Sequence, residues 1–104
     1  MSEDRRTPED CRSMSELRAE IDRVDAQLFD LFAERMGYIR RAAAIKEPAG
    51  IPADVPERVR EVVANAQRRA QERGLDPDLF GEFWQRLVAH AIATEEAILK
   101  PGER

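Results

Sequence analysis

The sequence contains very few of the residues that stabilise small proteins through disulfides or bound metals. Among its 104 residues there is one cysteine, Cys11, and one histidine, His90. A single cysteine cannot form an internal disulfide, and no group of His, Cys and acidic residues has the spacing of a zinc site, so we expect no bound metal. A domain of this length buries only about 60–65% of the surface of its unfolded chain. Self-association is therefore the expected support for its core.

Long apolar runs and an excess of positive charge are also missing. No stretch of 18 apolar residues occurs, and the polar N-terminus lacks the apolar region of a signal peptide, so we expect a cytoplasmic protein that does not bind membranes. A free cysteine fits a reducing compartment. Seventeen basic and 21 acidic residues give a net charge of −4, which argues against a nucleic-acid-binding surface. Any site for an anion must therefore be local.

Helical periodicity dominates what the sequence does contain. Residues 1–12 are polar and show no period, which predicts a flexible tail before a single helical domain over 13–100. Ser13 or Ser15 can cap a first helix that ends near Lys46. Its apolar residues recur at spacings of three and four: Leu17, Ile21, Val24, Leu28, Leu31, Phe32, Met36, Ile39 and Ala43. A helix of about 30 residues cannot bury such a stripe by folding on itself.

Proline and glycine divide the rest of the chain into a connection and two shorter helices. Residues 47–54 contain Pro and Gly and predict a loop. Pro56 fits the first turn of a second helix, which Gly74 ends, and Asp76 followed by proline caps a third helix that reaches Leu99. The prediction is an all-α fold with one long and two shorter helices. Two copies with antiparallel long helices would bury all the stripes as an intertwined homodimer.

Four basic residues are candidates for binding an anion. Arg35 and Lys46 are eleven residues apart and therefore only about 20° out of phase on one helix face. Arg18 precedes Arg35 by seventeen residues, about 25 Å, so it can share a small ligand with Arg35 only if it comes from another subunit. Arg58 lies just inside the second helix, where helix ends favour anions. The alternative for each is a solvated charge paired with an acid such as Glu61.

Glu95 continues an apolar series on the third helix, where a solvent-facing charge is not expected. Val88 and Ile92 precede it at helical spacing. Desolvation raises the pKa of a carboxyl group, and a protonated carboxyl can donate a hydrogen bond to an ether oxygen. The alternative is that Glu95 pairs with a basic neighbour. Both interpretations remain open at this point.

With these residues placed, the sequence resembles the all-helical, type II chorismate mutase family over residues 7–99. The segments that carry the resemblance are LRAEIDRVDAQLFDLFAERMGYIRRAAAIK (17–46), IPADVPERV (51–59), GLDPDLF (74–80) and ATEEAIL (93–99). A further segment, TPEDC (7–11), resembles the branch of the family that includes isochorismate pyruvate lyase. Helix lengths, the position of the loop and the order of the basic residues agree with the family.

The resemblance implies a substrate site shared between the two subunits of an intertwined homodimer. It carries six positions over to that site, namely Arg18, Arg35, Lys46, Arg58, Glu95 and Ile92. Arg18 would be supplied in trans, while Arg35, Lys46 and Arg58 would bind the carboxylates and ether oxygen of a small dicarboxylate. Glu95 falls where many relatives have glutamine and some have glutamate, which hydrogen-bonds the same ether oxygen. Ile92 would be one of the apolar residues that face the substrate.

The implied reaction is the rearrangement of chorismate to prephenate in aromatic amino acid biosynthesis, without a cofactor. Lys46, Glu95 and Arg35 would be its catalytic residues. Family mutases often carry acids at the positions of Val55 and Val59, and the lyase branch is apolar at the second of these. Cleavage of isochorismate to salicylate and pyruvate is therefore the first alternative, although the lyase branch carries glutamine at the position of Glu95. A non-catalytic helical dimer that binds or regulates a partner is the second alternative.

Overall fold

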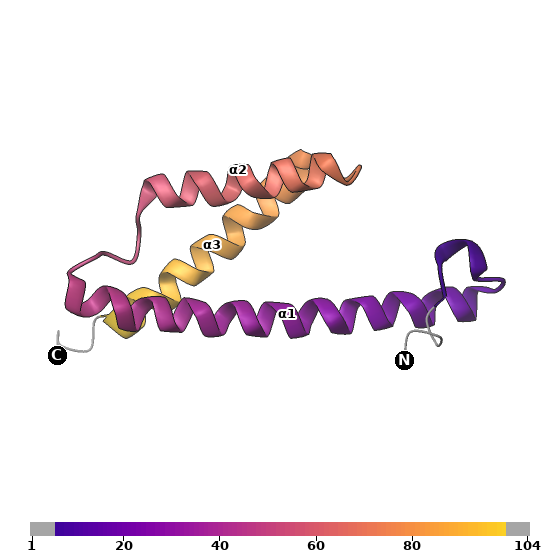
Figure 1. Cartoon of the computed structure of the whole chain (residues 1–104), viewed down its shortest axis with the longest axis horizontal. Helices are drawn as coiled ribbons and strands as arrows, with labels where there is room; N and C mark the ends of the chain where they lie inside the picture. The colour runs from indigo at the N-terminus through magenta and orange to yellow at the C-terminus, as the bar shows by residue number, and fades with distance from the viewer. Residues whose placement is uncertain (1–5, 100–104) are drawn as a thin grey trace. The chain divides into compact units, whose positions relative to one another are not determined.

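The computed structural model describes residues 6–99, and over this range all regular secondary structure is helical. A short 3-10 helix, η2 (Pro8–Asp10), precedes α1 (Met14–Ala49), α2 (Pro56–Glu72) and α3 (Pro77–Leu99) (Figure 1). With 36, 17 and 23 residues, the three α-helices confirm the predicted all-α fold of one long and two shorter helices. None of the helices in the described range is long and apolar enough to cross a membrane.

Of the two serines predicted as caps, Ser13 is the one that caps α1. The backbone N–H of Glu16 donates to Ser13 Oγ at 3.1 Å, and Glu16 Oε1 accepts from the backbone N–H of Arg12 at 2.7 Å. This exchange is close to a capping box, in which a serine and a glutamate three residues later satisfy free N–H groups at a helix start. The first turn of α1 is therefore fixed by its local sequence.

The end of α1 differs from the prediction. The helix continues past Lys46, with Pro48 inside its last turn. Gly50 ends it with a φ of 70°, and the N–H groups of Gly50 and Ile51 donate to the carbonyls of Glu47 and Lys46 at 3.2 and 3.0 Å. This is a Schellman motif, which glycine favours because it adopts positive φ without strain. The glycine therefore sets the helix end, and the proline costs only one hydrogen bond.

The end of α2 and the start of α3 lie at the predicted capping residues. Gly74 has a φ of 73° after α2, and the N–H of Leu75 donates to the carbonyl of Ala70 at 2.8 Å. Asp76 Oδ1 then accepts from the N–H of Asp78 at 2.9 Å, at the start of α3. Both boundaries confirm the prediction, because each depends on a cap formed by neighbouring residues.

The chain divides into two compact units, one of residues up to Arg35 and one of residues from Met36 onward. The predicted tail (1–12) and single domain (13–100) both include residues outside the described range, namely 1–5 and 100. Both therefore stay predictions.

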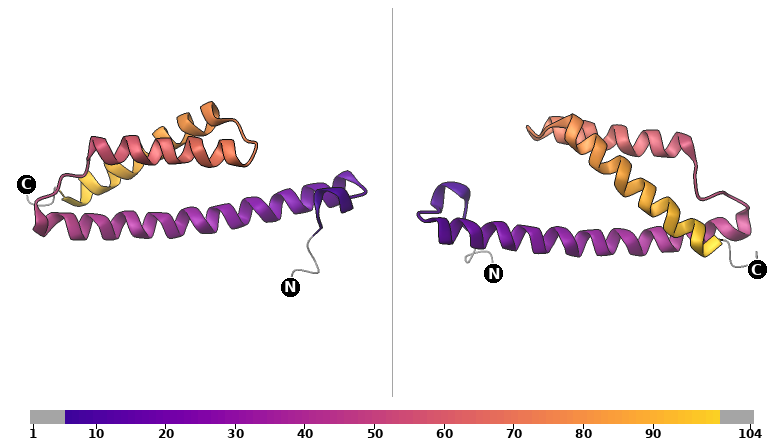
Figure 2. Two further views of the ribbon diagram at one scale, coloured as in Figure 1. Left: turned by 45° about the horizontal axis from the view of Figure 1, so that its top comes forward. Right: turned by 180° about the vertical axis from the view of Figure 1, so that it is seen from behind.

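The second unit contains the last turns of α1 together with α2 and α3. Helices α2 and α3 pack against each other, and the C-terminal end of α3 lies beside the last turns of α1 (Figures 1 and 2). Its buried residues are mostly small: Ala43, Ala53, Ala66, Ala70, Gly81, Val88, Ala91 and Glu95. Small residues let helices approach closely, and a buried glutamate in such a core requires a polar partner.

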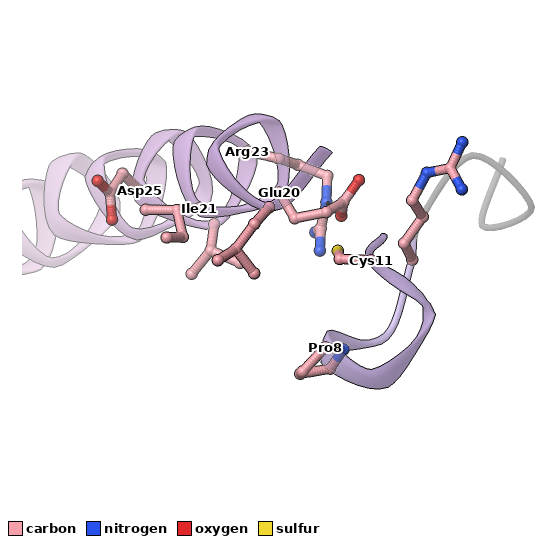
Figure 3. Close-up of a pocket in the computed structure, with 9 residues that line it drawn as sticks. Pro8, Cys11, Glu20, Ile21, Arg23 and Asp25 are labelled. Atoms are coloured by element: carbon pink, nitrogen blue, oxygen red, sulfur yellow. Dashed lines mark hydrogen bonds and ion pairs between the residues drawn. The ribbon is translucent and has the colours of Figure 1, made fainter. Parts of the chain in front are cut away.

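The first unit consists of η2 and the first part of α1. Residues 7–11 turn back toward α1, and Pro8, Cys11 and Ile21 line an open hollow of about 250 Å³ (Figure 3). The apolar stripe of α1 is exposed here, with Ile21 50% and Leu31 61% accessible. This unit leaves much of the predicted core face uncovered.

Candidate functional site

Lys46 and Glu95 form an ion pair in the second unit. Lys46 lies in the last turns of α1, and its Nζ donates to Glu95 Oε1 of α3 at 2.8 Å. The same Nζ donates to the backbone carbonyl of Ala53 at 3.0 Å. The Glu95 side chain is only 6% exposed and that of Lys46 20%. The two residues predicted to act on the same ether oxygen are therefore in direct contact.

The turn at Gly50 explains how the connection reaches Lys46. Because the Schellman motif reverses the chain after α1, the connection returns to Lys46, where the buried Ala53 offers its carbonyl. Sequence reasoning did not identify Ala53 as part of this cluster. A backbone carbonyl carries no side-chain signature, and only the chain reversal at Gly50 could have suggested it.

The pair combines the two interpretations of Glu95. The residue is buried in the apolar series, as expected, and it also has a basic neighbour, Lys46. An ammonium group has three N–H donors. Two acceptors contact Lys46 Nζ within the described part of the chain, so one donor direction remains for a ligand. The second oxygen of Glu95 likewise makes no hydrogen bond to a described residue.

One open hollow is lined by Lys46 itself, and a second is lined by Ile92, which precedes Glu95 on α3. Lys46 lines one of about 320 Å³ together with residues 50–53 of the connection. Ile92 lines a second, of about 330 Å³, with Val59 of α2 and Val88 of α3. Ile92 precedes Glu95 by three residues, so it is a neighbour of Glu95 on one face of α3. An apolar surface therefore adjoins the charged pair.

The remaining predicted site residues lie elsewhere. Arg58 projects from the first turn of α2, is 64% exposed and pairs with Glu61 at 2.7 Å, which matches the surface alternative. Arg18 is exposed and Arg35 half-buried on the part of α1 that belongs to the first unit. The structure thus brings together Lys46, Glu95 and Ile92, and the roles of the three arginines stay predictions.

The arrangement offers one cation and one carboxyl group in a place with little solvent. Electrostatic interactions are stronger there than in water, so the pair can hold a polar oxygen of a ligand firmly. Among the residues that the structure describes, no group of three His, Cys, Asp or Glu side chains is arranged to hold a metal ion.

Comparisons with known proteins identify relatives over most of the chain. A family model described as chorismate mutase type II matches residues 17–96. An isochorismate pyruvate lyase from Pseudomonas aeruginosa is 34% identical over 91 residues, 86% of this chain and 88% of that protein. A chorismate mutase from Methanocaldococcus jannaschii is 29% identical over 87 residues, 84% of this chain and 88% of that protein. A T-protein from Enterobacter agglomerans is 32% identical over 82 residues, which cover 79% of this chain and 22% of the T-protein.

Proposed function

Because the chain belongs to the type II chorismate mutase family, as its sequence predicted, we propose that it catalyses the rearrangement of chorismate to prephenate. The observation that carries the proposal is the buried pair of Lys46 and Glu95 beside the apolar hollow at Ile92. The names of two relatives, a chorismate mutase and a T-protein that this chain covers only in part, support the same activity.

The reaction needs little more than orientation and charge. The ether C–O bond of chorismate breaks while a C–C bond forms within the same molecule, and negative charge develops on the ether oxygen. The remaining N–H of Lys46 would donate to that oxygen, which stabilises the transition state more than the ground state. Glu95, which accepts a hydrogen bond from Lys46, would orient the ammonium group toward that oxygen, and no metal or cofactor takes part in the proposed step.

The exposed face of α1 supports a homodimer. Its seam positions alternate at spacings of three and four over more than three heptads: Ile21, Val24, Leu28, Leu31, Arg35, Tyr38, Ala42 and Ile45. A seam with a period of 3.5 residues is typical of helices that pack against another helix along their length. Tyr38 is 68% exposed in the single chain. A second copy, paired antiparallel along α1, is the occupant that we propose for this seam.

The same seam supports a contribution of Arg18 in trans. In the antiparallel register that uses every seam position, Ile21 lies opposite Ile45 of the partner subunit. Arg18 and Lys46 of the partner subunit then flank this layer on the same side. Two cations facing each other repel unless an anion lies between them. A dicarboxylate substrate between them would remove that repulsion, with Arg35 as the next base along the seam.

Arg58 would lose little free energy by leaving its ion pair to bind the substrate. Its ion pair with Glu61 is exposed on both sides, and such pairs contribute only about 0–1 kcal/mol. A substrate carboxylate held in a partly desolvated site offers a stronger, bidentate partner. We therefore keep Arg58 as a substrate-binding residue, together with Arg18 and Arg35.

The test is a side-by-side assay of the purified chain on two substrates. With chorismate and no added metal or nucleotide, we expect loss of chorismate absorbance and formation of prephenate, and Lys46→Ala should lower the rate strongly. A flat absorbance trace would contradict the proposal. If Arg35→Ala and Lys46→Ala changed neither activity nor ligand affinity, a binding or regulatory dimer would replace it.

Isochorismate is the second candidate substrate. The relative named isochorismate pyruvate lyase and the apolar Val59 in the hollow favour it. Salicylate fluorescence from isochorismate, at a rate well above that on chorismate, would make the lyase the main activity. We also propose a cytoplasmic location, because a free cysteine fits a reducing compartment.

A further inference from the structure

The hollow at Ile92 has a polar rim in addition to its apolar wall. Val59 of α2 and Val88 and Ile92 of α3 form its apolar wall. Arg60 of α2 and Gln85 of α3 also line it, so donors of two different helices border one apolar surface. An apolar hollow with a few polar groups is the usual form of a small-molecule site.

Arg60 differs from Arg58 in having its donors available. Arg58 is engaged by Glu61 at 2.7 Å. Arg60 makes no hydrogen bond or ion pair within residues 6–99, although it lines the hollow. A guanidinium group carries five N–H donors in a planar fork that matches a carboxylate. Of these two arginines on α2, Arg60 is the one that already borders the apolar wall.

The spacing along α3 connects this rim to the charged pair. Gln85, Val88, Ile92 and Glu95 follow one another at spacings of three, four and three, so they share one helix face. Val88 and Glu95 are about 10 Å apart along the helix axis, and Gln85 lies about 5 Å beyond Val88. A compact ring over Val88 and Ile92 can therefore reach Glu95 at one end and the rim at the other.

We propose that Arg60 is a further substrate-binding residue and that Gln85 completes a second polar end of the site. The inference rests on the proposed function. A carboxylate of the substrate would accept hydrogen bonds from the guanidinium of Arg60 and the side-chain amide of Gln85. Asp54 lines the same hollow. Its charge has the sign of the substrate, so it opposes binding and limits the affinity for dianions.

The experiment compares steady-state kinetics of Arg60→Gln with those of Arg86→Gln in the full chain. Arg86 is exposed on α3, has no partner among the described residues and does not line the hollow, so it controls for the loss of one positive charge. We expect Arg60→Gln to raise KM for the substrate about 10- to 100-fold, as expected for a lost charged hydrogen bond. The value of kcat should change much less, because a ground-state contact is lost. Asp54→Asn should lower KM.

Equal KM values for Arg60→Gln and Arg86→Gln would overturn the inference, and so would an unchanged KM in Asp54→Asn. If Arg60→Gln fails to fold, Arg60→Lys replaces it, and we expect an intermediate KM because one donor fork becomes a single ammonium. An unaltered chain that converts neither chorismate nor isochorismate would refute the proposed function itself. If the unaltered chain is active and Arg60→Gln does not change its KM, only the role of Arg60 is refuted.

Discussion

The two units of the chain differ in how far their apolar residues are buried. Among the described residues of the second unit, eight are buried, including Val88, Ala91 and the polar Glu95. None of the described residues of the first unit is buried, and Ile21, Leu28 and other large side chains of α1 are exposed. The second unit can therefore hold a charged pair by itself. The first unit has an apolar face that its own described residues leave uncovered.

One ion pair of each unit, Lys46–Glu95 in the second and Arg6–Glu16 in the first, shows a similar difference in burial. Lys46 and Glu95 are largely withdrawn from solvent, and removing one partner of such a pair costs about 3–5 kcal/mol. In the first unit, Arg6 pairs with Glu16 at 3.9 Å with half of the arginine side chain exposed. Pairs of that kind contribute about 0–1 kcal/mol. The pair of Lys46 and Glu95 is therefore expected to matter more for the structure than that of Arg6 and Glu16, while the pair of Arg23 and Glu20 in the first unit, at 2.8 Å with side chains 28% and 17% exposed, lies between these two in exposure.

The largest effect should come from Leu28→Asp, which tests whether a second copy covers the seam. Each dimer would lose two buried leucines, about 1.5–3 kcal/mol each, and would have to desolvate two carboxylates. We expect dissociation to monomers and loss of chorismate turnover, measured by light scattering and by activity. Ala26→Asp introduces the same charge on the opposite face of α1 and should leave the dimer intact. A dimeric Leu28→Asp protein would contradict the proposed seam.

Lys46→Met should have the next largest effect, because it leaves Glu95 buried without its cation. We expect a loss of about 3–5 kcal/mol in the free energy of unfolding at neutral pH, measured by urea denaturation. The double variant Lys46→Met/Glu95→Leu removes both charges and should recover most of that stability. It should not recover activity, because the ether oxygen then has no donor.

This double variant separates the structural role of the pair from its chemical one. If single and double variants were equally stable, the pair would not be a buried charge pair in the folded protein. A double variant that still converted chorismate at the normal rate would remove Lys46 and Glu95 from the proposed mechanism.

A smaller effect should follow from Gly81→Ala, which tests the packing of α3 on α2. A Cβ at Gly81 would lie 2.6 Å from Gln67 Nε2 and 3.0 Å from its Cγ, so Gln67 must move. Gly37→Ala on α1 meets no atom within 4 Å and should stabilise the helix by about 0.5–1 kcal/mol. We expect Gly81→Ala to be about 1–3 kcal/mol less stable than Gly37→Ala in thermal unfolding. Equal stabilisation at both sites would show that α2 and α3 are loosely packed.

The fold was predictable where neighbouring residues decide the outcome. Ser13, Gly74 and Asp76 form caps from atoms a few residues away, and all three predictions are confirmed. The predicted end of α1 near Lys46 was wrong, because Gly50 and not Pro48 ends the helix. A proline in a last turn removes one N–H, whereas a glycine with positive φ closes the helix with two hydrogen bonds.

The site was predictable only as a set of residue types. Lys46 and Glu95 were identified by separate arguments, and their contact joins residues 49 positions apart, which no local pattern encodes. The carbonyl of Ala53 has no sequence signal at all. Arg18 is exposed on α1, and the role in trans that we propose for it depends on a second chain, which the local sequence does not place.

The smallest effect is expected from Glu20→Gln in the first unit. A hydrogen bond from the side chain of Arg23, at 2.8 Å, lowers the pKa of Glu20, and Arg6 adds to this lowering. A carboxylate whose pKa is lowered by folding stabilises the folded state above its unfolded pKa, and this contribution disappears as the pH falls through its folded pKa. Glu20→Gln should therefore lower the melting temperature slightly at pH 7 and not at all in strong acid. A deficit that persisted in acid would point to packing by Glu20 and not to its charge.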